Sequence, residues 1–439
     1  MDLFPMAGGV LKGRTGQRMF PGELLNEMER MQMKKILYAT TAMATVGLIA
    51  GGAGSAVAAE RIQIEVHGFH QQWIVGLDQD FTDTDPGRED QGFKASTIDQ
   101  KTNSEICFTG ETTLDNGISV GVQVELEAAN SSFMVDESFL FLQSESLGQF
   151  KLGIEDPTTE LLHVSAPNGG VSVDDGDVGN VGMYIDTIGG GTSGILTSTS
   201  LGDMTTPGGI RNGDANRIMY ITPRYAGLQA GISYAPQSAE DSNTTNSANF
   251  ASFNGRYHDS VEGALNYKEA FGGVGVQLSA GVRYQNQLDD LSAFAGVDTG
   301  TMFGYSMGGQ LTFGGFTVGG AYRKISSGRD TPGTIAAQRS LQSDVWSAGA
   351  RYEIGPYAAG VSCINGEAVG WQTPGTGDLE HLNCTLSGTY TLGPGIRLIG
   401  GLFLFDDEAE APVGPAAGII DNTSDTDGWG GTVAITASF

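Results

Sequence analysis

The sequence predicts an all-β fold, a transmembrane antiparallel β-barrel of about sixteen strands. Apolar residues alternate with polar residues or glycine along segments of about ten residues, which is typical of strands with lipid on one face and water on the other. Tight turns and long loops join these segments alternately. After residue 59 no apolar run reaches the roughly 18 residues of a spanning helix, whereas a closed barrel can cross a membrane without one.

The first 59 residues are predicted to lie outside the barrel. Lys34-Lys35 is a short basic region, residues 36–52 are apolar and small, and residues 56–58 (Ala-Val-Ala) match a secretory cleavage site. We therefore interpret residues 33–59 as a signal peptide. Residues 1–32 are interpreted as a start assigned too early, with an extended basic region of the signal peptide as the alternative.

Composition and charge narrow the class of function. The chain has 51 acidic and 23 basic residues, a net charge of -28, and 67 glycines. Residues 1–59 hold six bases and four acids, so the predicted mature chain has 17 bases and 47 acids and a net charge of -30. This charge argues against nucleic-acid binding, which needs a basic surface. The regular apolar alternation argues against disorder.

The predicted strands are clearest where the alternation is unbroken. In residues 118–127 every even position is apolar and every odd position is polar or glycine, and residues 274–284, 303–313 and 382–392 repeat the pattern. The tight turns contain Gly or Asn, which permit the positive φ of hairpin turns. They lie near residues 115–117, 146–148, 225–227, 271–273, 314–315, 355–356 and 393–395. The long connections lie near residues 81–100, 129–135, 157–214, 236–259, 286–301, 326–342, 366–380 and 409–426. This strict alternation predicts that all tight turns lie at the same end of the barrel.

The longest connection, residues 157–214, has no sustained period and is rich in Gly, Ser, Thr and Asp. A loop of this length in a compact domain is usually functional or disordered. We expect it to fold into the barrel mouth and narrow the bore, with a loosely held surface loop as the alternative. The acids of this loop would then line the constriction: Asp174, Asp175, Asp177 and Asp186.

From Glu60 to Phe439 the chain resembles the Gram-negative general porins of the sixteen-stranded, trimeric kind. Residues 433–439 alternate and end on an aromatic residue, and residues 216–223 (Asn-Arg-Ile-Met-Tyr-Ile-Thr-Pro) are similar to the porin strand after the constriction loop. Residues 110–127 resemble the second porin hairpin, and the longest loop follows the fifth predicted strand. The resemblance implies short periplasmic turns, an inward-folded constriction loop and recognition of Phe439 by the barrel-assembly machinery. It also implies a homotrimer in contact with outer-membrane lipid and lipopolysaccharide.

Strand parity places charged side chains on the inner face, because Arg or Lys on the lipid face near the midplane costs about 2–4 kcal/mol. The inner charges are mainly acids in the early strands and bases in the later ones: Glu105, Glu111, Glu125, Glu127, Lys151 and Glu155, then Arg217, Lys268, Arg283, Arg323, Arg351 and Arg397. Opposed acidic and basic walls would create a field across the bore. The alternative is that individual charges are only solvated at the rims. Porins typically have bases in the early strands, so the arginine cluster of the family is not carried over to this chain.

Metal and thiol chemistry are weakly indicated. Asp174, Asp175 and Asp177 offer closely spaced oxygen ligands, as Ca²⁺ prefers, but no full twelve-residue calcium loop surrounds them. A solvated loop is the favoured interpretation, so no cofactor is expected apart from this candidate structural Ca²⁺. Cys363 and Cys384 share outward parity, so we expect a disulfide, with two separate thiols as the alternative. Cys107 has inward parity and no evident partner.

Taken with the resemblance, these patterns predict a passive, water-filled outer-membrane channel of a Gram-negative bacterium. We expect it to pass small hydrophilic solutes and ions and to prefer cations. No G-x-S-x-G, P-loop or H-E-x-x-H motif is present, so we expect no enzymatic activity. The alternatives are a substrate-specific channel and a plugged barrel with a structural or adhesion role.

Overall fold

A computed structural model describes most of the chain after residue 60. The described residues are 61–83, 98–129, 134–174, 178, 183, 196–202, 213, 215–237, 257–287, 301–327, 342–369, 379–410 and 423–439. The chain divides into two compact units, Met1–Ala59 and Glu60–Phe439. The first unit, which contains the predicted signal peptide and early start, lies outside the described residues. No helix in the described segments is long and apolar enough to span a membrane.

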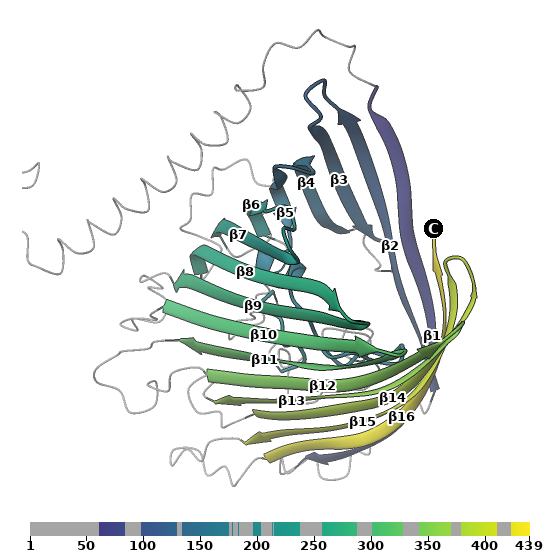
Figure 1. Ribbon diagram of the computed structural model, residues 1–439. Helices are drawn as coiled ribbons and strands as arrows, with labels where there is room; N and C mark the ends of the chain where they lie inside the picture. Colours follow the sequence, from purple (N-terminus) through teal and green to yellow (C-terminus); the bar gives the residue numbers. More distant parts are fainter. Residues whose placement is uncertain are drawn as a thin grey trace, which may run out of the picture. The chain divides into compact units, whose positions relative to one another are not determined.

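The described residues form sixteen antiparallel strands that close into a barrel, in which each strand pairs with its sequence neighbours and β1 pairs with β16 (Figure 1). The predicted fold class is therefore confirmed. The strands are β1 (Gln63–Asp83), β2 (Ile98–Thr113), β3 (Ser119–Glu127), β4 (Met134–Ser144), β5 (Gly148–Glu155), β6 (Ala215–Ile221), β7 (Leu228–Gln237), β8 (Tyr257–Phe271), β9 (Val274–Gln287), β10 (Thr301–Phe313), β11 (Phe316–Ser327), β12 (Gln342–Ile354), β13 (Tyr357–Val369), β14 (Leu379–Gly393), β15 (Ile396–Glu410) and β16 (Thr423–Ser438).

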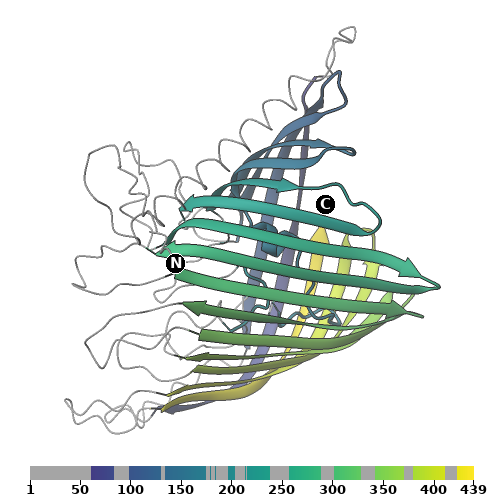
Figure 2. The same cartoon turned by 60° about the vertical axis from the view of Figure 1, so that its left-hand side comes forward.

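The alternation of the sequence appears as two faces of each strand. On β14, for example, Leu386 is exposed on the outer face, whereas the neighbouring Thr385 and Ser387 are buried on the inner face. The tight turns require glycine, because Gly314 and Gly315 between β10 and β11 have φ values of 55° and 85°. Figure 2 shows the strands running side by side between the same two ends of the barrel. The outer face is therefore an apolar surface suited to lipid.

The last residue takes part in closing the barrel. The backbone N–H of Phe439 donates to Gly68 O, and Gly68 N–H donates to Phe439 O, both at 3.0 Å. The Phe439 side chain is 66% exposed and continues the outward series of Val433 and Ile435. The chain end therefore extends the β1–β16 ladder by one residue pair and presents an aromatic ring on the outer face.

Replacing Phe439 by Ala, or deleting it, is expected to reduce the amount of folded barrel in the outer membrane. The substitution removes the exposed terminal ring, and the deletion also removes both hydrogen bonds to Gly68. Heat-modifiable mobility of membrane fractions measures the folded amount. Leu392→Ala is the control, because Leu392 is also exposed on the outer face. Equal folded amounts of the Phe439 variants and the wild type would show that the terminal residue is dispensable.

The two outward cysteines form a disulfide. Cys363 of β13 lies directly opposite Cys384 of β14, with their Cα atoms 4.1 Å apart, and the sulfur atoms are joined. Cys107 is buried and is not in a disulfide. Thiol labelling of the unreduced, denatured protein is therefore expected to detect one thiol of the three cysteines, and all three after reduction. Three labelled thiols before reduction would contradict the pairing.

Candidate functional site

The long loop between β5 and β6 begins inside the barrel and follows the inner wall. It starts with the short helix α2 (Thr158–Leu161). The backbone from Thr158 onward is hydrogen-bonded to inward side chains of consecutive strands, β7 to β10. These bonds are Thr158 N to Ser233 Oγ (3.3 Å), Asn266 Nδ2 to Leu162 O (3.0 Å), Val164 N to Ser279 Oγ (2.9 Å) and Gln310 Nε2 to Ser165 O (2.8 Å). The predicted inward fold of the loop is thus confirmed for its described part.

The loop then continues across β12 to β14 in direct contact with the wall. Val171 N–H donates to Ser387 Oγ at 3.2 Å, and Thr385 Oγ1 donates to Val171 O at 3.1 Å. A Cβ added at Gly349 of β12 would collide with the carbonyl oxygen of Pro167. The absence of a side chain at Gly349 therefore lets the loop backbone lie directly on the strand.

An apolar cluster joins the loop to the inner face of the later strands. Its loop members are Val171, Val173, Val178, Met183, Leu196 and Leu201. Its wall members come from β1 and β10 to β16, and they are Trp73, Val75, Met302, Ile325, Val345, Ile364, Ala368, Leu379, Ile399, Phe403, Phe405 and Ala434. Burying apolar side chains is favourable by about 25 cal/mol per Å². The cluster therefore holds the loop against this wall, and these inward positions contact protein rather than water.

Three arginines that were expected to line the open bore are buried instead. Arg217, Arg283 and Arg323 do point inward, but each is at most 3% exposed. Arg217 Nη1 and Arg283 Nε lie 3.0 and 3.1 Å from the carboxylate oxygens of Glu262, which is fully buried between them. Arg217 and Arg283 therefore share one carboxylate as their counter-charge.

The same arginines also hold the returning part of the loop. Arg283 Nη1 donates to Leu201 O at 2.8 Å, and Arg323 Nη1 donates to Ser200 O at 2.9 Å. Nearby, Arg217 Nη2 donates to Gly213 O at 2.5 Å. The three arginines thus anchor the loop to the barrel wall, because each donates a hydrogen bond to a backbone carbonyl of the loop.

Asp174 is likewise an anchor rather than a solvated acid. It is 3% exposed. Its carboxylate accepts hydrogen bonds from Thr199 N (2.8 Å), Thr199 Oγ1 (2.6 Å) and Ser347 Oγ of β12 (2.5 Å). The expectation that Asp174 lines the open constriction is corrected by this burial, since both oxygens are engaged in joining two parts of the loop to the wall. Asp175, Asp177 and Asp186 lie outside the described residues.

His163 extends this anchor. Its Nε2 lies 3.0 Å from Thr199 Oγ1, which gives its own proton to Asp174. A neutral His163 with the proton on Nε2 can therefore donate to Thr199. Burial lowers the pKa of His163, and Asp174 opposes this effect. The loop thus contains a hydrogen-bonded series from His163 through Thr199 to Asp174 that suits a neutral imidazole at pH 7.

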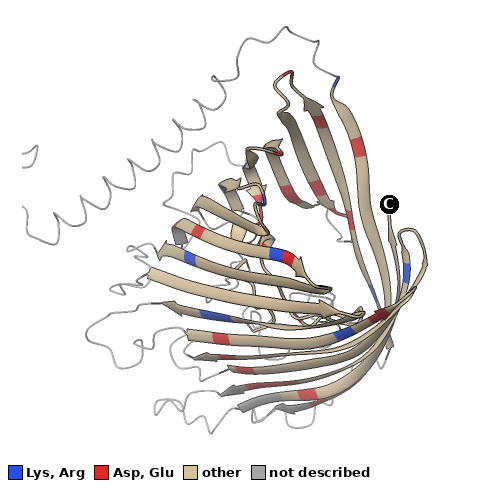
Figure 3. Cartoon of the chain, in the orientation of Figure 1, with Lys and Arg blue, Asp and Glu red and all other residues tan. Residues whose placement is uncertain are grey.

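The opposite wall, β2 to β5, carries accessible carboxylates. Glu105, Glu111, Glu125, Glu127 and Glu137 are all half-buried. Figure 3 shows acidic residues along the first strands, and basic residues on β8, β9, β11 and β12, with acidic residues on β8 and β12 as well. A cavity of about 550 Å³ lies on the inner side of β3 to β7 near the tight turns, and its lining includes Ser119, Gln143, Gln149, Thr222 and Gln229. This side of the barrel therefore combines a polar cavity at the tight-turn end, whose lining also includes Glu145 and Arg224, with half-buried glutamates along its strands.

Two further charges on this wall pair with each other. Lys151 Nζ lies 2.6 Å from Glu155 Oε2, and both side chains are largely buried. Lys151 also lies over the ring of Phe139, 4.3 Å from its centroid. Lys151 therefore offsets the charge of Glu155.

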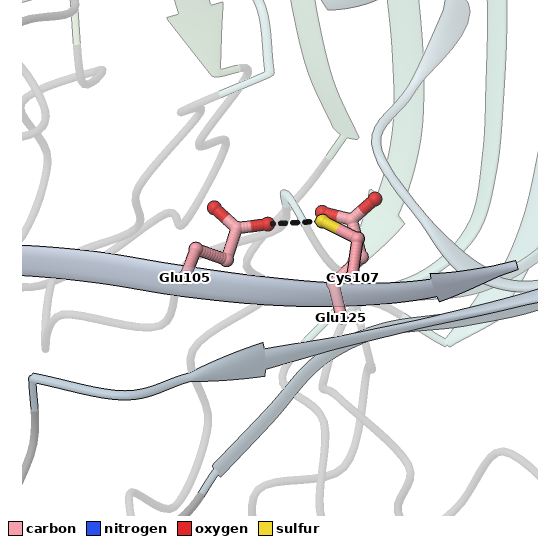
Figure 4. A group of neighbouring side chains, drawn as sticks. All are labelled: Glu105, Cys107 and Glu125. Atoms are coloured by element: carbon pink, nitrogen blue, oxygen red, sulfur yellow. Dashed lines mark hydrogen bonds between the residues drawn. The ribbon is translucent and has the colours of Figure 1, made fainter. Parts of the chain in front are cut away.

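Cys107 lies within the acidic wall (Figure 4). Its thiol donates to Glu105 Oε1 at 3.5 Å, and the ligand atoms of Glu105, Cys107 and Glu125 lie within 4.8 Å of one another. Sulfur and carboxylate oxygen atoms at this spacing could hold a metal ion such as Zn²⁺.

The predicted Ca²⁺ candidate lies elsewhere, in the loop. To bind the ion, Asp174 would have to give up the three hydrogen bonds that its carboxylate accepts.

The remaining predicted charges lie near the tight-turn end of the barrel. Arg351 is half-buried and pairs with Glu353 at 2.7 Å, whereas Lys268 and Arg397 are exposed. Two relevant acids, Glu137 and Glu262, were not among the predicted inner residues. The parity that placed Lys268 inward also applies to Glu262, and Glu137 has the same parity as the inward Phe139 and Phe141. Sequence parity could therefore have found both.

The inward-folded loop and the closed barrel define the class of an outer-membrane β-barrel channel. The sequence profile of the Gram-negative porins matches residues 39–409, so the chain belongs to the Gram-negative porin family. It is therefore a diffusion channel of the outer membrane. No curated protein matches the sequence.

Solved structures share the fold at low sequence identity. An anion-selective porin from Comamonas acidovorans is 18% identical, with 86% of this chain and 100% of that chain covered and a TM-score of 0.55. The outer membrane channel DcaP of Acinetobacter baumannii is 12% identical, with coverages of 86% and 98% and a TM-score of 0.51. OmpF of Salmonella typhi, in complex with daunomycin, is 13% identical, with coverages of 87% and 100% and a TM-score of 0.50. These likenesses support the fold alone.

Proposed function

We propose that this porin is a passive, water-filled channel for small hydrophilic solutes and ions, and that it prefers cations. The observation that carries the proposal is the different accessibility of the two charged walls. Glu105, Glu111, Glu125, Glu127 and Glu137 of β2 to β4 are half-buried, whereas Arg217, Arg283 and Arg323 are buried where they hold the loop.

The different burial of the acids and the arginines affects which ions pass through the channel. A passage lined by carboxylates raises the local concentration of cations and lowers that of anions. The effect is strongest when the Debye length, about 10 Å at 0.1 M salt, is comparable with the width of the passage. The arginines oppose it less than exposed ones would, because Glu262 supplies a shared counter-charge for Arg217 and Arg283 and because all three arginines are buried.

Conductance and reversal potentials in planar bilayers test the proposal. We expect ohmic single channels in KCl and, in a KCl gradient at low salt, a reversal potential that indicates K⁺ preference and weakens as salt rises. A preference for Cl⁻ would contradict the cation assignment. A silent protein would favour a plugged barrel, and block by one solute alone would favour a substrate-specific channel.

The assembly is part of the same proposal. The resemblance to trimeric porins supports a homotrimer, inserted by the barrel-assembly machinery and surrounded by outer-membrane lipid and lipopolysaccharide. The largely apolar outer face suits both lipid and neighbouring subunits. Light scattering of the detergent-solubilised protein tests the trimer, and a monomeric mass for a conducting protein would exclude it.

A further inference from the structure

A second cavity lies on the loop-covered side of the barrel, at its tight-turn end. Its volume is about 230 Å³, and it lies between residues 168–172 of the loop and the inner wall near the turn at Gly355. A buried water needs roughly 10–15 Å³ of such space, so the cavity can admit a small organic molecule. The polar side chains that line it include Gln71, Asn168, Arg351, Thr389, Thr391 and Arg397.

Hydrogen bonds determine whether the oxygen or the nitrogen of the Gln71 and Asn168 amides is available to a ligand. Trp73 Nε1–H donates to Gln71 Oε1 at 3.1 Å, and Gly170 N–H donates to Asn168 Oδ1 at 2.9 Å. Both donors are N–H groups, so each must meet an amide oxygen rather than an amide nitrogen. The NH₂ groups of Gln71 and Asn168 therefore remain as donors at the cavity.

Two guanidinium groups add positive charge and further donors. Arg351 donates through Nη2 to Glu353 at 2.7 Å, and its Nε is buried without a hydrogen-bond partner. Arg397 is exposed at the cavity and has no ion-pair partner among the described residues. The Arg351–Glu353 pair is itself well exposed, and such pairs are weak. With Glu353 included, the lining carries a net charge of +1 and an excess of N–H donors.

Donors of this kind select oxyanions. The planar guanidinium group matches the two oxygens of a carboxylate, and charge-assisted hydrogen bonds are roughly twice as strong as neutral ones. The lining of this cavity carries a net positive charge, whereas the charged residues along β2 to β4 are mainly glutamates. It therefore offers a different interaction from the one that sets the proposed ion preference.

We propose that this cavity is a binding subsite for the carboxylate group of a small organic acid that crosses the channel. Arg351 and Arg397 supply the charge, and the amides of Gln71 and Asn168 supply oriented donors. The subsite rests on the proposed function in that its ligand arrives through an open channel. An organic acid thus binds at the tight-turn end, on the side of the barrel that does not carry the acidic wall.

Single-channel recording of the full protein with succinate tests the subsite, and succinamide is the neutral probe of similar shape. Succinate is expected to reduce the KCl current in a saturable way, and succinamide is not. The Arg351→Gln/Arg397→Gln variant should raise the half-blocking succinate concentration by about tenfold, since two charge-assisted contacts are lost. The control is Lys268→Gln, which removes one positive charge at the same end of the barrel but not from the cavity lining, and its effect is compared with that of each single arginine variant as well as the double variant.

The outcomes separate the subsite from the channel. Equal effects of succinate and succinamide, or equal effects of Lys268→Gln and the double arginine variant, would overturn the subsite. Block by inorganic phosphate without block by succinate would overturn the assignment to carboxylates. Absence of any KCl current would contradict the proposed channel instead. In that case calorimetric titration of the detergent-solubilised protein with succinate still decides the subsite, and heat-modifiable mobility verifies that each variant is folded.

Discussion

Replacing Glu105 and Glu125 together by glutamine is expected to lower the K⁺ preference of the channel by at least about twofold near 0.1 M KCl. The two carboxyl groups lie side by side at the inner face of β2 and β3, and glutamine keeps their size while removing the negative charge that the pair carries. Reversal potentials of wild type and variant in the same KCl gradient measure the change. Near 1 M KCl the Debye length falls to about 3 Å, so the difference between the two proteins should largely disappear.

The control for this experiment is Glu269→Gln. Glu269 is exposed near the turn between β8 and β9 and shares the outward parity of Val261 and Leu265. It therefore carries the same charge on the outer face of the barrel. An unchanged reversal potential in the Glu105/Glu125 variant, or an equal change in Glu269→Gln, would show that the acidic wall does not set the ion preference.

The second large effect is expected from Glu262→Gln. Glu262 is buried between Arg217 and Arg283, so its neutralisation leaves two guanidinium groups without their shared counter-charge. Breaking a buried ion pair by removing one partner typically costs about 3–5 kcal/mol. We expect a lower midpoint of urea unfolding. We also expect a larger single-channel conductance, because Arg283 also holds the loop at Leu201.

The unfolding midpoint and the conductance report on two separate roles of Glu262, which are stabilising the barrel and holding the loop in place. Glu269→Gln, on the same strand but exposed, should leave both the unfolding midpoint and the conductance unchanged. If Glu262→Gln unfolds at the wild-type urea concentration, the ion-pair cluster does not stabilise the barrel. If it is destabilised but conducts like the wild type, the cluster does not hold the loop in the bore.

The barrel could be predicted from the sequence because its signals are local. Alternation at residues 118–127 and glycine at the turn of Gly314 and Gly315 each depend on a few neighbouring residues. Every predicted tight turn therefore joins two observed strands. The outward parity of Cys363 and Cys384 was also local, and the register of β13 and β14 brings these residues together.

The site was less predictable because its contacts span long distances in the sequence. Parity correctly pointed Arg283 inward, but the acceptor Leu201 is 82 residues away and follows from the path of an aperiodic loop. The same limit applies to Asp174, whose partner Ser347 is 173 residues away. Parity states which way a side chain points, but the loop determines whether that side chain meets water.

The most direct measurement determines which inner wall of the barrel faces the water-filled passage. Gln123 of β3 is half-buried on the acidic wall, and Ser306 of β10 is 3% exposed on the wall that the loop follows. In a Cys107→Ser background, each position is replaced by cysteine, and a cationic methanethiosulfonate reagent is added during single-channel recording. The account predicts that the reagent reduces the current through the Gln123→Cys channel and leaves the Ser306→Cys channel unchanged. Modification of Ser306→Cys without modification of Gln123→Cys would place the passage on the other side of the loop and contradict the account.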